Sequence, residues 1–125
     1  MLCIEDDPAN QLLMQRMLSR RTDLRLLLAS GGSQGVELAR ANRPDVVLMD
    51  INLPGISGLE AMKMLADDAA TAHIPVIAVS ANAMPRDVEK GVQAGFFRYL
   101  TKPIKIDQFM EALDAALNLP KAGSR

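Results

Sequence analysis

The sequence predicts a doubly wound α/β domain, in which a five-stranded parallel sheet carries helices on both faces. Five short apolar runs recur along the chain, and segments with the apolar spacing of helices lie between them. The runs are apolar throughout, which indicates strands that are buried on both faces. Strands that alternate with helices are joined by right-handed crossovers, which place helices on each side of the sheet.

Each apolar run is interpreted as one strand. The expected strands are residues 2–4, 24–29, 46–49, 76–79 and 96–100. The 125 residues suffice for one domain with a single core. We therefore expect one domain over residues 1–119, followed by a flexible C-terminal tail at 120–125.

Start and stop signals support the helices between these strands. Asp7 followed by Pro8 is typical of an N-cap with proline at the first helical position. Ser57 with Glu60 three residues later has the spacing of a capping box. Gly95 fits the end of the helix before the fifth strand. The last helix is indicated by apolar residues at helical spacing after residue 107, namely Phe109, Met110, Leu113 and Leu117.

Composition excludes several classes of function. The net charge of −1 leaves no basic face for nucleic acid, so no direct nucleic-acid partner is expected. Cys3 is the only cysteine, so one chain can build neither a disulfide nor a thiolate zinc site, which favours a reducing cytoplasmic location. The longest apolar runs are far shorter than the roughly 20 residues of a membrane span, so no membrane segment is expected in this chain.

The polar residues that carry chemistry follow the expected strands. In a parallel sheet all strands end at the same edge, so such residues can meet although they lie far apart in sequence. They are Glu5 and Asp6 after the first strand, Asp50 after the third, Ser80 after the fourth and Lys102 after the fifth. For the common strand order 2-1-3-4-5, Asp6 and Asp50 face each other at the point where such folds open a ligand crevice.

This set of residue types indicates phosphoryl chemistry beside a metal. Crowded carboxylates repel one another and favour a bound cation. Mg²⁺ fits best, because it binds oxygen ligands and needs only one or two carboxylates. A lysine and a hydroxyl group next to them can hold the oxygens of a phosphoryl group. A carboxylate in this setting, here Asp50, can act as the nucleophile.

Four segments resemble the motifs of bacterial response-regulator receiver domains. They are EDDP at residues 5–8, MDINLPGISG at 49–58, SANAM at 80–84 and YLTKP at 99–103. Their order and spacing match the family over nearly the whole chain. The resemblance implies a flavodoxin-like fold with five parallel strands in the order 2-1-3-4-5 and five helices.

The resemblance also implies a two-component phosphorelay. Phosphoryl would pass to Asp50 from the phosphohistidine of a histidine kinase or histidine phosphotransfer domain. Mg²⁺, or Mn²⁺ in its place, would be held by the side chains of Asp6 and Asp50 and by the backbone carbonyl of Asn52, with Glu5 acting through a water. Such a domain is a regulatory phosphoacceptor that catalyses its own phosphorylation and dephosphorylation, and is not an enzyme in the usual sense.

Further positions would form a switch. Lys102 would pair with the phosphoryl group, Ser80 would reach toward it, and Tyr99 would follow by a change of rotamer. The surface formed by helix 4, strand 5 and helix 5 would be remodelled, and a homodimer through this surface is a further expectation. In the family the peptide bond before Pro103 is cis. Gly91, within the fourth helix, suits a helix that moves, because glycine has low helix propensity.

Other positions bear on the lifetime of the phosphoryl group, on partner surfaces and on the origin of the chain. Asn52 and Asn82 stand at positions that tune the lifetime of the phosphoryl group in the family. Phe97 could mark an exposed partner surface or could be buried by packing of the strand. The SANAM segment resembles the receivers of hybrid sensor histidine kinases, so we expect the chain to derive from a larger protein of that type.

Two other functions would use part of this set of residues. A Mg²⁺-dependent phosphohydrolase of the haloacid dehalogenase type also uses an aspartyl phosphate, but its Asp-x-Asp motif follows the first strand, whereas here the sequence is Asp50-Ile51-Asn52 after the third. A degenerate receiver used only for protein contacts is the other alternative. The intact set of Asp6, Asp50, Ser80 and Lys102 argues against it.

Overall fold

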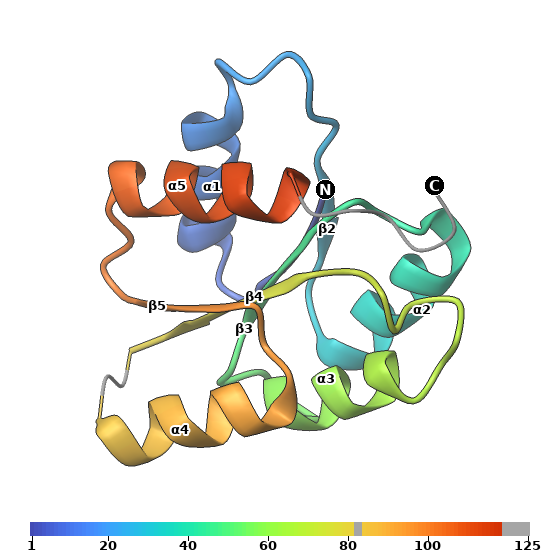
Figure 1. Ribbon diagram of the computed structural model, residues 1–125. Coiled ribbons are helices and arrows are strands. Elements are labelled where there is room, and N and C mark those ends of the chain that lie inside the picture. Colours follow the sequence, from blue (N-terminus) through green and yellow to red (C-terminus); the bar gives the residue numbers. More distant parts are fainter. Residues whose placement is uncertain (82–83, 119–125) are drawn as a thin grey trace.

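The computed structural model describes residues 1–81 and 84–118 and shows one sheet between two layers of helices (Figure 1). All five strands pair in parallel, in the order β2-β1-β3-β4-β5, which confirms the predicted topology. In chain order the elements are β1 (Leu2–Ile4), α1 (Pro8–Leu18), β2 (Leu27–Ala29), α2 (Gly32–Asn42), β3 (Val47–Asp50), α3 (Gly58–Ala66), β4 (Val76–Ser80), α4 (Pro85–Ala94), β5 (Arg98–Thr101) and α5 (Ile106–Leu117). The expected tail at 120–125 and Asn82 lie outside the described residues.

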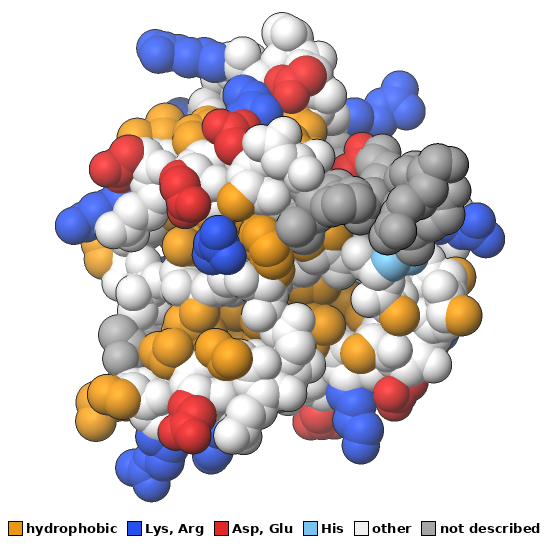
Figure 2. All heavy atoms as spheres, viewed as in Figure 1, with side chains coloured by type: hydrophobic (Ala, Val, Ile, Leu, Met, Phe, Trp, Pro, Cys, Tyr) orange, Lys and Arg blue, Asp and Glu red, His pale blue; other side chains and the backbone are white. Residues whose placement is uncertain are grey.

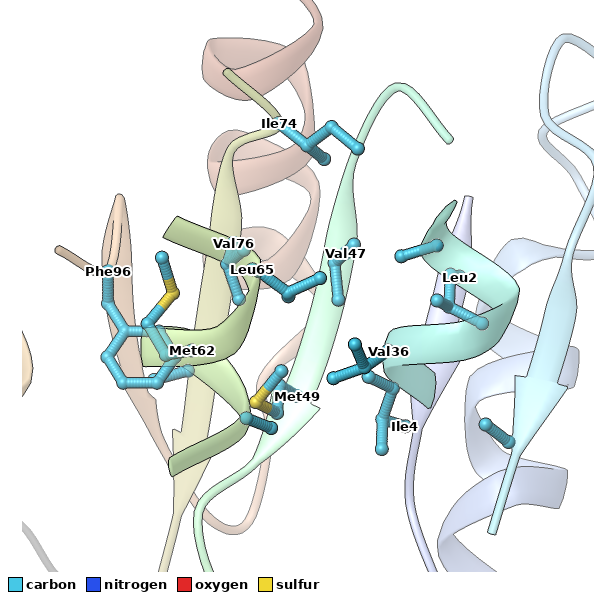
Figure 3. Packing of buried hydrophobic residues seen from close by; sticks show 14 of the residues in the cluster. Leu2, Ile4, Val36, Val47, Met49, Met62, Leu65, Ile74, Val76 and Phe96 are labelled. Carbon is cyan, nitrogen blue, oxygen red and sulfur yellow. The ribbon is translucent and has the colours of Figure 1, made fainter. Parts of the chain in front are cut away.

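Two apolar clusters hold the helices to the sheet. One lies between the sheet and α2, α3 and the end of α4, and Figure 3 shows its side chains from β1, β3 and β4 pointing toward α2 and α3. The other lies between the opposite face of the sheet and helices α1 and α5. Because both faces are covered, the central strands are apolar throughout, as the sequence indicated.

The helix termini follow the predicted signals. A carboxylate oxygen of Asp7 accepts a hydrogen bond from the amide of Ala9 at 2.9 Å, and α1 begins at Pro8. The hydroxyl of Ser57 accepts from the amide of Glu60 at 3.2 Å at the start of α3. Helix α4 ends at Ala94 and is capped by Gly95, whose φ of +104° lies in the left-handed region that favours glycine.

Two strands begin two or three residues later than the apolar runs predicted, and β3 begins one residue later, at Val47. The run from residue 24 was expected to be strand from its start, but β2 begins at Leu27, because the amide of Leu24 donates to the carbonyl of Arg21 in a turn. The prediction for β5 was wrong at its start for a similar reason. Phe96 donates its amide to the carbonyl of Gly91, so it completes the end of α4 instead of the sheet ladder.

Buried positions also answer questions that the sequence left open. Cys3 is fully buried in β1. Phe97 is half-buried and packs against the cluster under α5, which favours the strand-packing alternative over an exposed partner surface. The guanidinium of Arg98 lies 4.4 Å from the centre of the Phe97 ring. Among the described residues, no helix is long and apolar enough to cross a membrane.

Candidate functional site

Residues at the carboxyl ends of β1, β3 and β5 meet at one edge of the sheet. Glu5 directly follows β1, Asp50 is the last residue of β3, and Lys102 directly follows β5. The amide of Lys102 donates to the carbonyl of Ser80 at 2.8 Å, so the ends of β4 and β5 are also tied together. The rule that parallel strands end at one edge therefore brings these residues together as predicted.

Three carboxylates form a compact acidic cluster. Oxygens of Glu5, Asp6 and Asp50 all lie within 4.8 Å of one another. Glu5 and Asp50 are 5% and 4% exposed, whereas Asp6 is open to solvent. Burying two ionised carboxylates lowers the stability of the fold unless a cation faces them.

Lys102 supplies that positive charge. Its Nζ lies 2.9 Å from Asp50 Oδ2 and 3.3 Å from Glu5 Oε1. Burial on its own would lower the pKa of Lys102, but the hydrogen bond to Asp50 and the two negative charges outweigh it, so the pKa is raised. Lys102 is therefore charged at neutral pH and bridges the two buried acids.

Glu5 holds its place by contacts with the start of α1. The amide of Asp7 donates to Glu5 Oε2 at 3.2 Å, and the side-chain amide of Gln11 donates to the backbone carbonyl of Glu5 at 2.6 Å. Burial, followed by the nearness of Asp50, raises the pKa of Glu5. Gln11 was not anticipated from the sequence, because a polar residue on a helix gives no sign of the loop that it contacts.

The segment after Asp50 is held by backbone contacts. The amide of Asn52 donates to Asp50 Oδ1 at 2.9 Å, and the amide of Gly58 donates to the carbonyl of Ile51 at 2.9 Å. A Cβ on Gly58 would lie only 2.6 Å from the backbone oxygen of Asp50. Glycine at this position therefore lets α3 approach the end of β3 and hold the loop that carries Asn52.

Ser80 and Tyr99 line a hollow of about 80 Å³ on the α4 side of Asp50. Ser80 is buried and Tyr99 is half-buried. The remaining lining residues are Ile51, Asn52, Leu59, Asp87 and Lys90. Asp87 and Lys90, which lie one turn apart on α4, were not anticipated, because the spacing within a helix does not show which neighbour each face meets.

The donor set of the cluster suits a hard cation. Mg²⁺ and Mn²⁺ prefer oxygen ligands, which the three carboxylates and nearby backbone carbonyls provide. The one thiol of the chain belongs to Cys3, whose pKa burial raises to about 12, and it lies outside the cluster of Glu5, Asp6 and Asp50. The peptide bond between Lys102 and Pro103 is cis.

Comparison with known proteins agrees with this geometry. The family model of the response regulator receiver domain matches residues 1–114. The polar-differentiation response regulator DivK of Brucella anthropi is 41% identical over 116 residues, which cover 93% of this chain and 94% of DivK. DivK of Brucella abortus strain 2308 is 40% identical over the same shares.

Solved structures give the same picture. The receiver domain of sensor histidine kinase PA1611 from Pseudomonas aeruginosa PAO1 is 35% identical, with a TM-score of 0.85 over 94% of this chain and 96% of that domain. That crystal structure has a magnesium ion coordinated in the active site cleft. The chemotaxis protein CheY4 of Vibrio cholerae, at 21% identity and a TM-score of 0.85 over 93% of this chain and 96% of its own, supports the fold alone. The haloacid dehalogenase alternative therefore finds no support, and the chain belongs to the response regulator receiver domains, the regulatory phosphoacceptors of two-component signalling.

Proposed function

We propose that Asp50 is the residue that accepts the phosphoryl group. The observation that carries this proposal is the contact between its nearly buried carboxylate and Lys102, at 2.9 Å, beside the acids Glu5 and Asp6. Asp50 is the last residue of the central strand β3. The next two strands of the sheet bring Ser80, at the end of β4, and Lys102, just after β5, to the same edge. Asp50 thus combines a nucleophile with groups that can stabilise negative charge.

Mg²⁺, or Mn²⁺ in its place, would be held by the side chains of Asp6 and Asp50 and the backbone carbonyl of Asn52, with Glu5 acting through a water. The compact acidic cluster supports this assignment, as does the magnesium in the cleft of the PA1611 receiver. When bound, the ion neutralises charge that builds up on the phosphoryl oxygens. The protein's part is to orient the carboxylate of Asp50 through the amide of Asn52 and the ammonium of Lys102.

The transfer follows from this arrangement. A carboxylate oxygen of Asp50 attacks the phosphorus of a phosphohistidine on a histidine kinase or a histidine phosphotransfer domain. The P–O bond forms while the P–N bond breaks, and the imidazole leaves with the electron pair of that bond. Lys102 then exchanges its contact with Asp50 for one with the phosphoryl oxygens. Hydrolysis of the acyl phosphate by the same site, tuned by Asn52 and Asn82, resets the domain.

The signal would leave through α4, β5 and α5. Ser80 would turn toward the phosphoryl group and Tyr99 would change rotamer, because both line the hollow that Ile51 and Asn52, the two residues after Asp50, also line. Figure 2 views this side of the molecule and shows hydrophobic side chains between α5 above and α4 below, with charged side chains around them. Such a surface fits a protein partner or a second copy of the chain. We also propose a cytoplasmic location for this domain and an origin in a hybrid sensor kinase, and the likeness to the receiver domain of the sensor histidine kinase PA1611 is in keeping with a kinase origin.

Phosphorylation by a small donor tests the assignment. Incubated with Mg²⁺ and acetyl phosphate, the protein should gain one acid-stable, base-labile phosphoryl group, measured as a mass increase. Asp50→Asn should abolish the increase, and Asp6→Asn should weaken Mg²⁺ binding in a titration. Undiminished phosphorylation of Asp50→Asn would refute the assignment. A wild-type protein that stays unmodified would point to the degenerate receiver.

A further inference from the structure

Gly91 and Tyr99 form a close contact between α4 and β5. Gly91 is buried in the last part of α4, and Tyr99 lies in β5, at the edge of the sheet beside that helix. A Cβ built on Gly91 would meet Cδ2 of the Tyr99 ring at 2.7 Å and Cε2 at 3.0 Å. The first distance is shorter than real Cβ atoms show, and the second is tighter than most real Cβ contacts, so the ring packs directly against the helix backbone.

The ring cannot adjust to a larger residue by a small shift. It is rigid and moves as a whole by rotation about its χ1 and χ2 bonds, between a few favoured rotamers. The backbone of Gly91 is also fixed, because its carbonyl accepts hydrogen bonds from the amides of Gly95 and Phe96 at the end of the helix. Any side chain at position 91 must therefore displace Tyr99 or break the end of α4.

From this contact we infer that Gly91 is a positioning residue: because it has no side chain, the ring of Tyr99 can pack directly against the backbone of α4. A residue with a side chain at position 91 holds the ring off the helix. The ring then moves toward solvent, because the hollow beside Ser80 measures only about 80 Å³, about half the volume of a cavity known to hold benzene. The effect of residue 91 on signalling rests on the proposed switching role of Tyr99. Its effect on the packing of the ring is independent of that proposal.

Tyrosine fluorescence provides a direct test. Tyr99 is the single tyrosine and the chain has no tryptophan, so the intrinsic emission reports on this ring alone. In the wild-type protein, acrylamide should quench Tyr99 weakly. In Gly91→Ala, quenching should rise toward that of the urea-unfolded protein while the circular dichroism stays native. Val92→Ala, at the neighbouring exposed position, makes a similar change in helix propensity and should leave quenching at the wild-type value.

A double-mutant cycle measured by thermal melting tests whether the effect of residue 91 acts through the ring of Tyr99. Alanine has a higher helix propensity than glycine, so Gly91→Ala should raise the melting temperature by about 4 °C in a Tyr99→Ala background, where the ring is gone. In the wild-type background the same change should bring no gain. An equal gain in both backgrounds would mean that a side chain at position 91 does not clash with the ring. Unchanged quenching of Tyr99 in Gly91→Ala would mean that α4 moved instead of the ring. Either result would overturn the inference.

Phosphorylation separates this inference from the proposed function. Gly91→Ala should incorporate phosphoryl from acetyl phosphate to the wild-type extent. Its Tyr99 quenching should stay the same on phosphorylation, whereas that of the wild type should change. If the wild-type protein is not phosphorylated, the proposed function fails while the packing inference still stands on the quenching data. If both proteins are phosphorylated and both change equally, the inference is wrong and the proposed function stands.

Discussion

Replacing Gly58 tests whether the close approach of α3 positions Asp50. In Gly58→Ser, the new Cβ would lie 2.6 Å from the backbone oxygen of Asp50 and 2.7 Å from the Cα of Ile51. Both are backbone atoms, so no side chain can turn aside. To reach the 3.4 Å at which ordinary contact begins, α3 and the end of β3 must separate by about 0.8 Å.

That separation has two measurable consequences. Overpacking of this kind costs about 1–3 kcal/mol. At roughly 4 °C for each kcal/mol in a domain of this size, the melting temperature should fall by about 4–12 °C. A displacement near 1 Å can slow a reaction by about 100-fold, so the rate of phosphorylation of Asp50 by acetyl phosphate should fall by up to that factor.

Gly31→Ser is the matched control for Gly58→Ser. It adds the same atoms next to the start of a helix, but a Cβ at Gly31 meets nothing within 4 Å, and its φ of −155° suits any residue. Serine is also favoured at the N-cap position that Gly31 occupies. Equal melting temperatures and equal rates for the two variants would refute the reasoning. A fall in melting temperature with an unchanged rate would show that Asp50 is held independently of α3.

Substitutions at three further residues test other contacts. Folding raises the pKa of Glu5, so ionisation of its carboxyl group opposes folding. Without metal, the free energy of unfolding of the wild type should fall relative to that of Glu5→Gln as the pH rises from 4.5, the ordinary pKa of this group, through the raised pKa. Urea midpoints measured at several pH values should show this fall. Thr71→Val removes the 2.7 Å hydrogen bond to the carbonyl of Leu65 and should cost about 1 kcal/mol in urea unfolding; no loss would contradict that role. Asp7→Ala removes the N-cap contact to Ala9 and should cost about 1 kcal/mol, whereas Asp7→Ser should restore most of it.

The sequence predicted the architecture because apolar runs and helical spacing report burial directly. It did not predict where β2 and β5 begin, because Leu24 and Phe96 pack into the apolar clusters without joining the ladder of the sheet. Leu24 packs against the cluster under α1 and α5, and Phe96 is buried at the end of α4, while their amides are bonded outside the ladder. An apolar run shows that side chains are buried, and only the backbone geometry shows which amides the strand uses.

The site was predictable to the extent that strand ends determine it. Asp50 and Lys102 meet because the order of the strands brings their ends together. The sequence could not supply the contact between Gln11 and the carbonyl of Glu5, which depends on a rotamer. Gly91 was interpreted as a residue that makes a helix movable, and the structure gives a more specific reason, since the ring of Tyr99 occupies the space of its side chain.

Strand β5 connects the acidic cluster to the surface of α4. Lys102, just after the strand, contacts Asp50, and Tyr99, within it, lies on the backbone of Gly91. The strand itself is fixed, because it pairs residue by residue with β4 and the amide of Lys102 is bonded to Ser80. Sliding of β5 by one residue would turn all its side chains to the opposite faces, which the cores on both sides forbid. If the proposed function holds, a change at Asp50 would reach α4 through rotation of side chains on a fixed strand, and the size of residue 91 would determine whether Tyr99 can follow.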